Sequence, residues 1–344
     1  MNNLRLTVDR DALVRNWQAL DRLSGSARAG AAIKADGYGL GASRSLQALQ
    51  AAGCQDFFVA HWEEAAGLAG DAGQSSLSVL HGIGPADMEL ANSLAAVPVL
   101  NTADQVARWK ALGGGTCHVM FDTGMNRLGL AMADIGNGLL DGLDIDICMS
   151  HLASADEDSA QNTLQLARFL DIRQGVKARR YSLANSAGIM LGSDYHFDLT
   201  RPGLALYGGV PRADMQPHIE TVASLEARLM QLRTVPAGDS IGYGATFVAR
   251  RDMRVGVVSL GYADGFQRSL SGQGVSLRHG DADLPLLGRI SMDLVCIDLG
   301  NAPHLAEGDW VTLPLDLLAL EAASGIAQYE QLTHLGQRFE RVWR

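Results

Sequence analysis

The chain has 344 residues, of which 47% are hydrophobic and 19% charged, and its formal net charge is -10. This length suffices for two domains, or for one α/β barrel with a further domain attached, and no apolar run reaches the ~18 residues that a membrane-spanning helix needs. A negative chain without a basic run is a poor ligand for nucleic acid, so we expect a small molecule as partner.

Two further features bear on the compartment. The amino-terminal residues, MNNLRLTVDRDALVRN, carry charges every few positions and lack the apolar core of a signal peptide, which predicts a cytoplasmic protein. The four cysteines, Cys54, Cys117, Cys148 and Cys296, are far apart and have no companion histidines at zinc-binding spacing. We therefore expect reduced thiols and no metal site.

The first two thirds of the chain alternate short apolar runs with segments of helical spacing. Residues 9–23 illustrate the helical segments, because Leu13, Trp17 and Leu20 fall on one face and Asp9 or Asp11 is available as N-cap. The apolar runs lie near residues 30–34, 56–60, 77–80, 97–100, 116–121, 145–150, 180–184 and 203–207. Eight strand-helix units predict an α/β fold whose first domain is a (β/α)8 TIM barrel.

The pattern changes after Tyr207, where a Gly-Gly-Val-Pro stretch and Pro217 favour a connection between domains. From there to about residue 314, β-rich runs alternate with turn signals, which predicts a mostly-β domain at the carboxyl end. We expect a barrel over residues 9–221 and a β domain over 222–344, with residues 1–8 as a candidate addition to the latter. The final thirty residues are mixed in character.

Lys34 stands where the first apolar run ends and a glycine-containing segment begins. Barrel enzymes carry their chemistry at this rim, and an amine next to an apolar strand is partly desolvated. Desolvation favours the neutral amine, which suits bond formation with an aldehyde cofactor. The alternative is a lysine whose stem lies along the apolar surface while its charge reaches solvent.

Other polar residues lie at later apolar runs, and we expect a barrel to bring them to the same rim: Arg127 just beyond the fifth run, His151 ending the sixth, Asn185 and Ser186 ending the seventh, and Arg201 and Gly203 at the eighth. Barrels commonly bind phosphate with the loops after strands seven and eight, where Ser186 and the backbone of Gly203 and Leu204 fall. A phosphorylated cofactor is therefore expected. Taken singly, Asn185 and Ser186 also suit a helix cap, Arg201 a surface ion pair, and His151 a hydrogen-bonded core position.

In the second domain, Tyr243 lies between Gly242 and Gly244, which leaves its hydroxyl accessible. A phenol acts as a base only where cations or hydrogen bonds stabilise its anion. A plain turn explains this residue equally well, and the same holds for residues 261–265 (GYADG) and 291–293 (SMD).

These segments, in this order, resemble the alanine racemase family over nearly the whole chain. The matching segments are residues 34–39 (KADGYG), 122–129 (DTGMNRLG), His151, Asn185 with Ser186, 201–207 (RPGLALY), 242–246 (GYGAT), 261–265 (GYADG), 288–293 (GRISMD) and Tyr329 with Glu330. Each motif is short, but their number and order make coincidence improbable.

The resemblance implies a pyridoxal 5'-phosphate-dependent racemase that acts on a small neutral amino acid, most simply L-alanine to D-alanine, with Lys34 and Tyr243 as two bases on opposite faces of the substrate. It also implies a head-to-tail homodimer, with Tyr243 and Met292 reaching the site from the partner subunit. The implied supporting residues are Tyr38, Ser186, Gly203, Leu204 and Tyr329 at the cofactor phosphate, His151 against its ring, Arg201 at the ring nitrogen, Arg127 and Met292 at the substrate carboxylate, and Tyr262 and Asp293 at the entrance.

The sequence departs from the family pattern at four positions. Met120 stands where many members have a lysine that orients the arginine matching Arg127, while Leu40 and Ser182 replace histidines and Gln267 replaces a proline. These departures bear on substrate range and efficiency more than on reaction type. Three alternatives stay open: a racemase preferring serine or a broader set of amino acids, a non-catalytic cofactor-binding protein, and a decarboxylase. The sequence shows neither the acceptor cysteine nor the glycine-rich phosphate loop expected of the decarboxylase.

Overall fold

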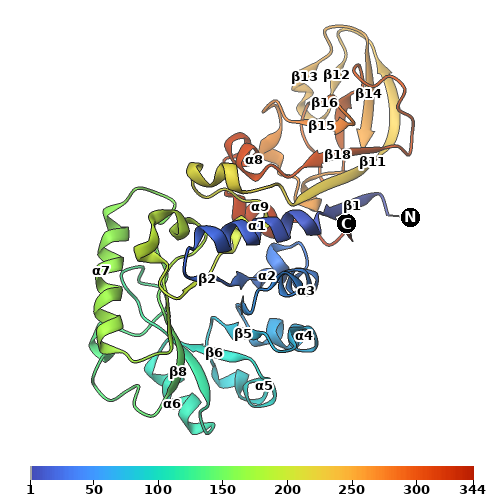
Figure 1. Cartoon of the computed structure of the whole chain (residues 1–344). Coiled ribbons are helices and arrows are strands. Elements are labelled where there is room, and N and C mark those ends of the chain that lie inside the picture. Colours follow the sequence, from blue (N-terminus) through green and yellow to red (C-terminus); the bar gives the residue numbers. More distant parts are fainter. Residues whose placement is uncertain (1) are drawn as a thin grey trace. The chain divides into compact units, whose positions relative to one another are not determined.

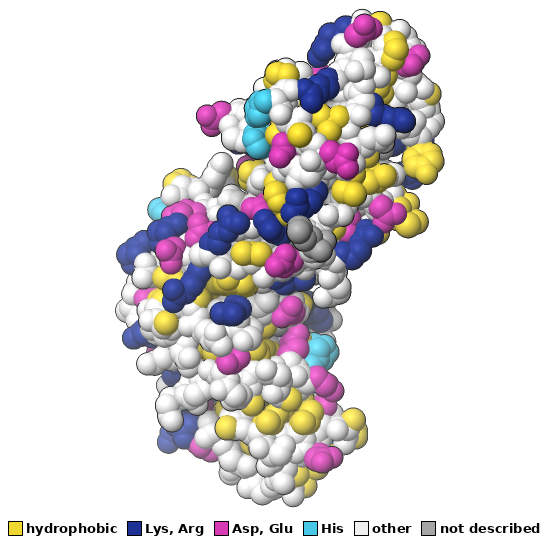
Figure 2. Space-filling view, turned by 90° about the vertical axis from the view of Figure 1, so that its right-hand side faces the viewer, with side chains coloured by type: hydrophobic (Ala, Val, Ile, Leu, Met, Phe, Trp, Pro, Cys, Tyr) yellow, Lys and Arg dark blue, Asp and Glu magenta, His cyan; other side chains and the backbone are white. Residues whose placement is uncertain are grey.

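The computed structural model describes residues 2–344. The chain forms two compact units, one made of Leu13–Glu220 and the other of Thr221–Arg344 together with the residues before Leu13. Within the described residues, no helix combines the length and apolar content that crossing a bilayer requires. Figure 2 shows a face on which acidic side chains lie among the basic ones.

The unit Leu13–Glu220 is built on parallel strands that pair in chain order. Each strand is short and largely buried, and β4 is buried along its whole length, as expected for a parallel sheet covered on both faces. The strands are β3 (Ala31–Ala32), β4 (Asp56–Val59), β5 (Ser76–Val79), β6 (Val97–Leu100), β7 (Thr116–Met120), β8 (Asp144–Met149) and β9 (Arg180–Ser182).

The barrel is closed by β10 (Leu199–Thr200), which pairs in parallel with β2 (Arg28–Ala29). On its other side, Arg201 forms a parallel bridge with Asn185 just beyond β9. The predicted barrel is thus confirmed, but the predicted eighth strand at residues 203–207 is wrong. Leu204–Tyr207 is a buried 3-10 helix instead. An apolar run buried on every side has no period that separates strand from helix, and Pro202 cannot donate to a ladder.

The helices of this unit follow their strands, and Figure 1 shows α3, α4 and α5 one after another along one flank of the parallel strands, with α7 on the opposite flank. The helices are α2 (Lys34–Tyr38), α3 (Ala42–Ala52), α4 (Trp62–Ala72), α5 (Met88–Ser93), α6 (Ala103–Ala111) and α7 (Ala160–Gly175). The first helix, α1 (Arg10–Leu23), begins as predicted, because the carboxylate of Asp9 accepts a hydrogen bond from the Ala12 amide at 2.8 Å.

The unit that contains Thr221–Arg344 is mostly β, as predicted. Its long strand β11 (Ala223–Val235) pairs with β1 and β18 and, after a bulge between Leu229 and Gln231, with β14. The other strands are β1 (Leu4–Val8), β12 (Ser240–Ile241), β13 (Phe247–Val248), β14 (Met253–Val258), β15 (Ser276–His279), β16 (Ala282–Leu287), β17 (Val295–Asp298), β18 (Trp310–Pro314) and β19 (Glu340–Trp343). The mixed final segment forms α8 (Leu317–Ser324), α9 (Gln328–Thr333) and β19.

Candidate active site

Lys34 lies at the carboxyl end of the first barrel strand, directly after the buried Ile33. The backbone then turns in the left-handed direction, with φ of 53° at Ala35, 51° at Asp36 and 55° at Tyr38. Such a conformation is unfavourable for residues other than glycine, by roughly 1–2 kcal/mol each. Strain of this kind persists only where the surroundings impose it, and it is commonest at functional sites.

Two carboxylates hold this turn in place. Glu64, in the first turn of α4, accepts hydrogen bonds from the Ala35 amide at 2.6 Å and from the Ala60 amide at 2.7 Å. Asp36 accepts one from the Ala42 amide at 2.8 Å, at the start of α3. The turn that follows Lys34 is therefore fixed to two neighbouring helices.

Three influences act on the amine of Lys34. Burial lowers its pKa from the ordinary value, and the nearby charge of Arg127 lowers the pKa further. Glu64 is the carboxylate that opposes both. The result is an amine that gives up its proton more readily than a surface lysine does, as a nucleophilic or basic lysine requires.

Tyr38, Ser186 and Gly203 meet on the same side of the barrel. The Ser186 hydroxyl accepts hydrogen bonds from the Gly203 amide at 2.9 Å and the Ala205 amide at 3.3 Å. A Cβ at Gly203 would overlap the hydroxyl of Tyr38, so this position requires glycine for close approach. The ring of Tyr38 stacks on that of Tyr207 with centroids 4.8 Å apart. Hydroxyl and amide groups thus converge where sequence reasoning expected phosphate.

Arg201 is a buried cation held by neutral groups. Its guanidinium donates to the Ser182 hydroxyl and to the Ser150 carbonyl, the latter at 2.5 Å. Among residues 2–344, no carboxylate pairs with it. Burial lowers the pKa of Arg201 to about 10, which leaves the group protonated at neutral pH.

His151 follows β8 and faces the same cations. Burial lowers the pKa of His151 to about 3, and the charges of Arg201, Arg127 and Lys34 act in the same direction. The imidazole is therefore neutral across the physiological pH range. An uncharged ring beside three cations is suited to packing and hydrogen bonding, and unsuited to carrying a charge of its own.

The second unit brings its predicted residues together in adjacent loops. The Tyr262 amide donates to the Ser291 carbonyl at 3.1 Å, and the Ala263 amide donates to the Met292 carbonyl at 2.9 Å. Tyr243 begins a short 3-10 helix, and the guanidinium of Arg289 lies beside the neighbouring Gly244. Tyr243 and Met292 are exposed by 71% and 54%, so these loops present large side chains to solvent.

Tyr329 lies elsewhere in this unit, on α9, and is also exposed. Arg338 ties two of the loops together, because it donates to the buried carboxylate of Asp264 at 2.7 Å and to Asp293 at 2.8 Å. Sequence reasoning placed Asp293 at the entrance of the site but missed Arg338.

The comparisons with known proteins agree with this geometry. The N-terminal domain model of alanine racemase matches residues 8–211, and the C-terminal domain model matches residues 222–343. The chain belongs to the alanine racemase family. A relative named alanine racemase from Rhizobium meliloti is 41% identical over 98% of this chain and 96% of its own length. One named biosynthetic alanine racemase, from Agrobacterium fabrum, is 41% identical over 99% and 93%.

Solved structures of the alanine racemase family share the fold along the full chain. The structure from Bartonella henselae, described with covalently bound pyridoxal phosphate, has a TM-score of 0.90 at 32% identity, with 100% of both chains covered. The biosynthetic alanine racemase from Pseudomonas aeruginosa has a TM-score of 0.88 at 33% identity, again over 100% of both chains.

The departures from the alanine racemase pattern have simple structural roles. Met120 and Leu40 are buried apolar side chains. The Ser182 hydroxyl donates a hydrogen bond to the Leu199 carbonyl and accepts one from Arg201. Gln267 has φ of -56°, which proline also adopts, so the backbone needs no adjustment there.

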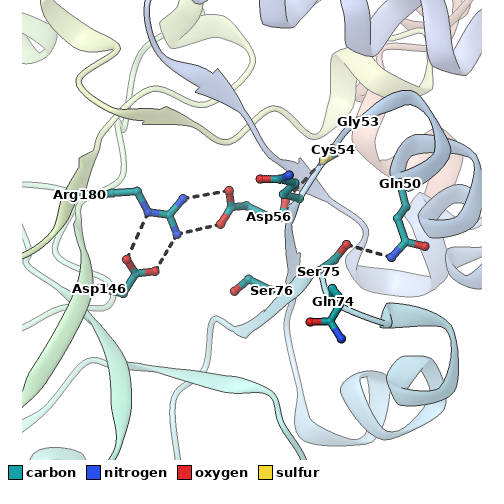
Figure 3. Close-up of a pocket in the computed structure, with 10 residues that line it drawn as sticks. Gln50, Gly53, Cys54, Asp56, Gln74, Ser75, Ser76, Asp146 and Arg180 are labelled. Atoms are coloured by element: carbon teal, nitrogen blue, oxygen red, sulfur yellow. Dashed lines mark hydrogen bonds and ion pairs between the residues drawn. The ribbon is translucent and has the colours of Figure 1, made fainter.

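A polar cavity of about 570 Å³ lies at the opposite end of the barrel and is no part of this site. Figure 3 shows its central group, in which Arg180 at the start of β9 binds Asp56 at the start of β4 and Asp146 on β8. The shortest distances are 2.9 Å to Asp56 and 2.6 Å to Asp146. Amino ends of barrel strands serve stability, and these charges are already paired.

Proposed function

We propose that this chain is a pyridoxal-phosphate-dependent racemase that interconverts L- and D-alanine, with Lys34 and Tyr243 as the two proton-transferring groups. The observation that carries the proposal is Lys34, a largely buried amine whose pKa is lowered by burial and by Arg127 at the rim of a barrel. Relatives at 41% identity that are named alanine racemase support alanine as the substrate.

The rim residues suit a phosphorylated aldehyde. Lys34, Arg127 and Arg201 bring three cations to a region where Glu64 supplies the opposing carboxylate, so an anion would balance the charge. Bound pyridoxal phosphate supplies an aldehyde that joins an amino group and a conjugated ring that accepts electron density from the α-carbon. The residues proposed to hold its phosphate are Tyr38, Ser186, Gly203, Leu204 and Tyr329.

The remaining barrel residues would orient the cofactor ring and the substrate. Arg201 would donate a hydrogen bond to the ring nitrogen and, because it stays protonated, would leave that nitrogen without a proton. A weaker electron acceptor limits side reactions. His151 would lie against the ring as a neutral imidazole, and Arg127 with the Met292 backbone would receive the substrate carboxylate.

Racemisation returns a proton to the face opposite the one it left, so two groups on opposite sides suit it better than one. The neutral amine of Lys34 would remove the α-proton on one face, and the ammonium so formed would deliver a proton there in the reverse direction. The hydroxyl of Tyr243 would deliver the proton on the other face, and the phenolate it leaves would remove a proton there; the guanidinium of Arg289 lies beside the adjacent Gly244. We take residues 9–221 as the cofactor-binding domain and 222–344 as the domain that supplies Tyr243.

The test is a racemisation assay on the purified protein with pyridoxal phosphate. L-Alanine should be converted to D-alanine, measured with D-amino-acid oxidase, and the reverse reaction should occur as well. A panel that includes L-serine checks the substrate range. Binding of the cofactor without turnover of any amino acid would overturn the proposal in favour of a binding protein.

The two proton-transfer roles need separate experiments. Borohydride should fix the cofactor on the peptide that contains Lys34, as read by mass spectrometry. Tyr243→Phe should slow exchange of the α-proton from L-alanine far more than from D-alanine. Equal slowing of both would contradict the assignment of Tyr243 to one face.

We further propose a head-to-tail homodimer in which Tyr243 and Met292 act in the partner's site. The exposed apolar side chains of Tyr243, Met292 and Tyr262 support an interface at these loops. Mixing Lys34→Ala with Tyr243→Phe subunits should restore about a quarter of the normal activity, since half of the dimers are hybrids with one intact site each. No restoration after verified subunit exchange would place both groups in one chain.

A cytoplasmic location is proposed as well. Cys54, Cys117, Cys148 and Cys296 are free, as expected in a reducing compartment. Relatives from Agrobacterium fabrum named biosynthetic and catabolic are 41% and 40% identical, so similarity favours neither role for the D-alanine.

A further inference from the structure

The backbone of the loop that carries Arg127 is fixed by several hydrogen bonds. Its two ends are joined, because the Asp122 amide donates to the Leu130 carbonyl at 3.0 Å and the Leu130 amide to the Met120 carbonyl at 2.8 Å. The carboxylate of Asp122 accepts hydrogen bonds from three successive amides, those of residues 124, 125 and 126. Asn126, just before Arg127, has the left-handed φ of 56°.

The side chain of Arg127 receives no comparable support. It is exposed, and within residues 2–344 no hydrogen bond or ion pair holds its guanidinium. Met120, at the end of the preceding strand, is buried and offers no charge to orient it. The direction of Arg127 must therefore come from the backbone of its loop.

Side chains of helix α7 donate hydrogen bonds to that backbone at two consecutive peptide groups. Arg168 donates to the Thr123 carbonyl at 2.8 Å, and Gln161 donates to the Gly124 carbonyl at 2.9 Å. Between them on the same helix face, Gln165 donates to the Thr123 hydroxyl at 2.9 Å and to the His151 carbonyl at 2.9 Å. One rigid helix thus contacts the Arg127 loop and the end of the His151 strand together.

The side chains of Arg168 and Gln161 approach residue 124 so closely that a Cβ there would displace them. A Cβ on Gly124 would lie 2.7 Å from the Arg168 guanidinium and 3.0 Å from the Gln161 amide, and Gly124 also has φ of 131°. The network continues inward, since the Thr123 hydroxyl lies 2.8 Å from that of Ser150, whose carbonyl binds Arg201.

We propose that Gln161 and Arg168 of α7 are positioning residues for substrate binding, which orient Arg127 by holding the carbonyls of Thr123 and Gly124. Their role rests on the proposed function, in which Arg127 receives the carboxylate of the amino acid. Neither residue touches the substrate. They act on how well the carboxylate is bound and leave the proton-transferring groups unchanged.

The experiment compares Arg168→Met and Gln161→Met with Arg168→Lys and Gln174→Met. Lysine can still donate to the Thr123 carbonyl, and Gln174 is an exposed glutamine at the far end of the same helix. Each methionine variant at the loop should raise the KM for alanine about five- to tenfold, the loss expected for one hydrogen bond, while kcat changes less than about twofold. Arg168→Lys should bring KM most of the way back to the wild-type value, and Gln174→Met should have the KM of the wild type.

Hydrogen exchange gives a readout that needs no turnover. Peptides covering residues 122–130 should exchange faster in Arg168→Met and Gln161→Met, while peptides from β4 and β5 should not. A uniform rise in exchange or a large fall in Tm would mean a structural role only and would overturn the proposal. So would equal KM values in all variants, or a KM increase in Gln174→Met.

The two proposals fail in different ways. If the wild-type protein turns over no amino acid, the proposed function fails, and hydrogen exchange still decides whether α7 holds the loop. If the wild-type protein is active and the KM and exchange of the methionine variants are unchanged, the positioning role alone is wrong. Gln161→Met, at a partly exposed position, keeps the experiment decisive if Arg168→Met does not fold.

Discussion

The two ends of the barrel differ in whether carboxylates pair with their cations. At the carboxyl ends of the strands, Lys34 is desolvated beside Arg127, and Arg201 is buried among hydroxyl and carbonyl groups. At the amino ends, Arg180 is shared by Asp56 and Asp146 with short contacts to both (Figure 3). A cation that no carboxylate pairs with lowers the stability of the unliganded protein, but it can bind an anion. A fully paired cluster contributes to the stability of the fold instead.

Lys34→Ala should have the largest effect of the proposed variants. It should abolish activity without lowering stability, which separates the two ends of the barrel most clearly. Activity should fall by at least about a thousandfold, because the nucleophilic amine is lost. The free energy of unfolding should stay within about 0.5 kcal/mol of wild type or rise, since a desolvated cation has been removed. Urea unfolding beside the alanine assay checks both. A fall of several kcal/mol would show that the rim, too, is built for stability.

Between the two ends of the barrel lies His118, whose lowered pKa should make the stability of the fold depend on pH. It is fully buried on β7, accepts a hydrogen bond from the Ile147 amide, and contacts the Ser78 hydroxyl. Burial lowers the pKa of His118 to about 4, with Asp146 opposing the shift.

The unfolded chain therefore binds a proton between pH 6.5 and 4 that the folded chain does not, and stability should fall as the pH falls through this window. The contribution of His118 is at most about 3 kcal/mol. His118→Gln should flatten the dependence by up to one proton, as measured by urea unfolding from pH 7 to pH 4.5. An unchanged slope would mean that His118 binds its proton at the same pH in the folded and the unfolded chain.

At the amino ends, Arg180→Met should reduce stability by about 2 kcal/mol, because it leaves the carboxylates of Asp56 and Asp146 unpaired in a partly buried place. Activity per folded molecule should not change. The neighbouring Arg179 is the matched control, since it pairs with Asp144 on the surface, and Arg179→Met should alter stability by less than about 0.5 kcal/mol. Equal effects of the two variants would remove the distinction between the Arg180 cluster and a surface pair.

The smallest expected effect is that of Ser186→Ala at the rim. Loss of the hydroxyl that accepts from Gly203 and Ala205 should weaken binding of pyridoxal phosphate about five- to tenfold, the value of roughly one hydrogen bond. Titration of the apoprotein followed by absorbance measures this. Ser193→Ala, at an exposed serine, should bind as wild type does. If the two variants bind alike, Ser186 does not hold the phosphate.

The sequence predicted those parts of the molecule that depend on local pattern. Lys34 was recognisable because an apolar run ends at it, Ser186 because it follows the seventh run, and Gly203 because it stands at the start of the eighth. The eighth strand was misplaced, since residues 203–207 are apolar and buried without a strand period. The runs were also too short to reveal that Leu199 and Thr200 pair with Arg28 and Ala29.

Residues that act through distant backbone groups could not be predicted. Glu64, Gln161 and Arg168 are polar residues on helices, where a solvent-facing position is the simplest expectation. Their partners are carbonyls and amides of loops far away in the chain, and such groups leave no mark in the sequence. Arg338 was missed for the same reason, because its link from Asp264 to Asp293 exists only in the folded β unit.

The pairing of β2 with β10 has a consequence for how the protein is made. The first barrel strand pairs with β4 early but finds its second neighbour only after Leu199 has been synthesised, so a growing chain carries an open parallel sheet with two unpaired edges. Contacts this distant along the chain slow folding and leave strand edges open to aggregation. Ribosome-bound fragments that stop short of Leu199 should therefore depend on chaperones, and fragments extended to Glu220 should not.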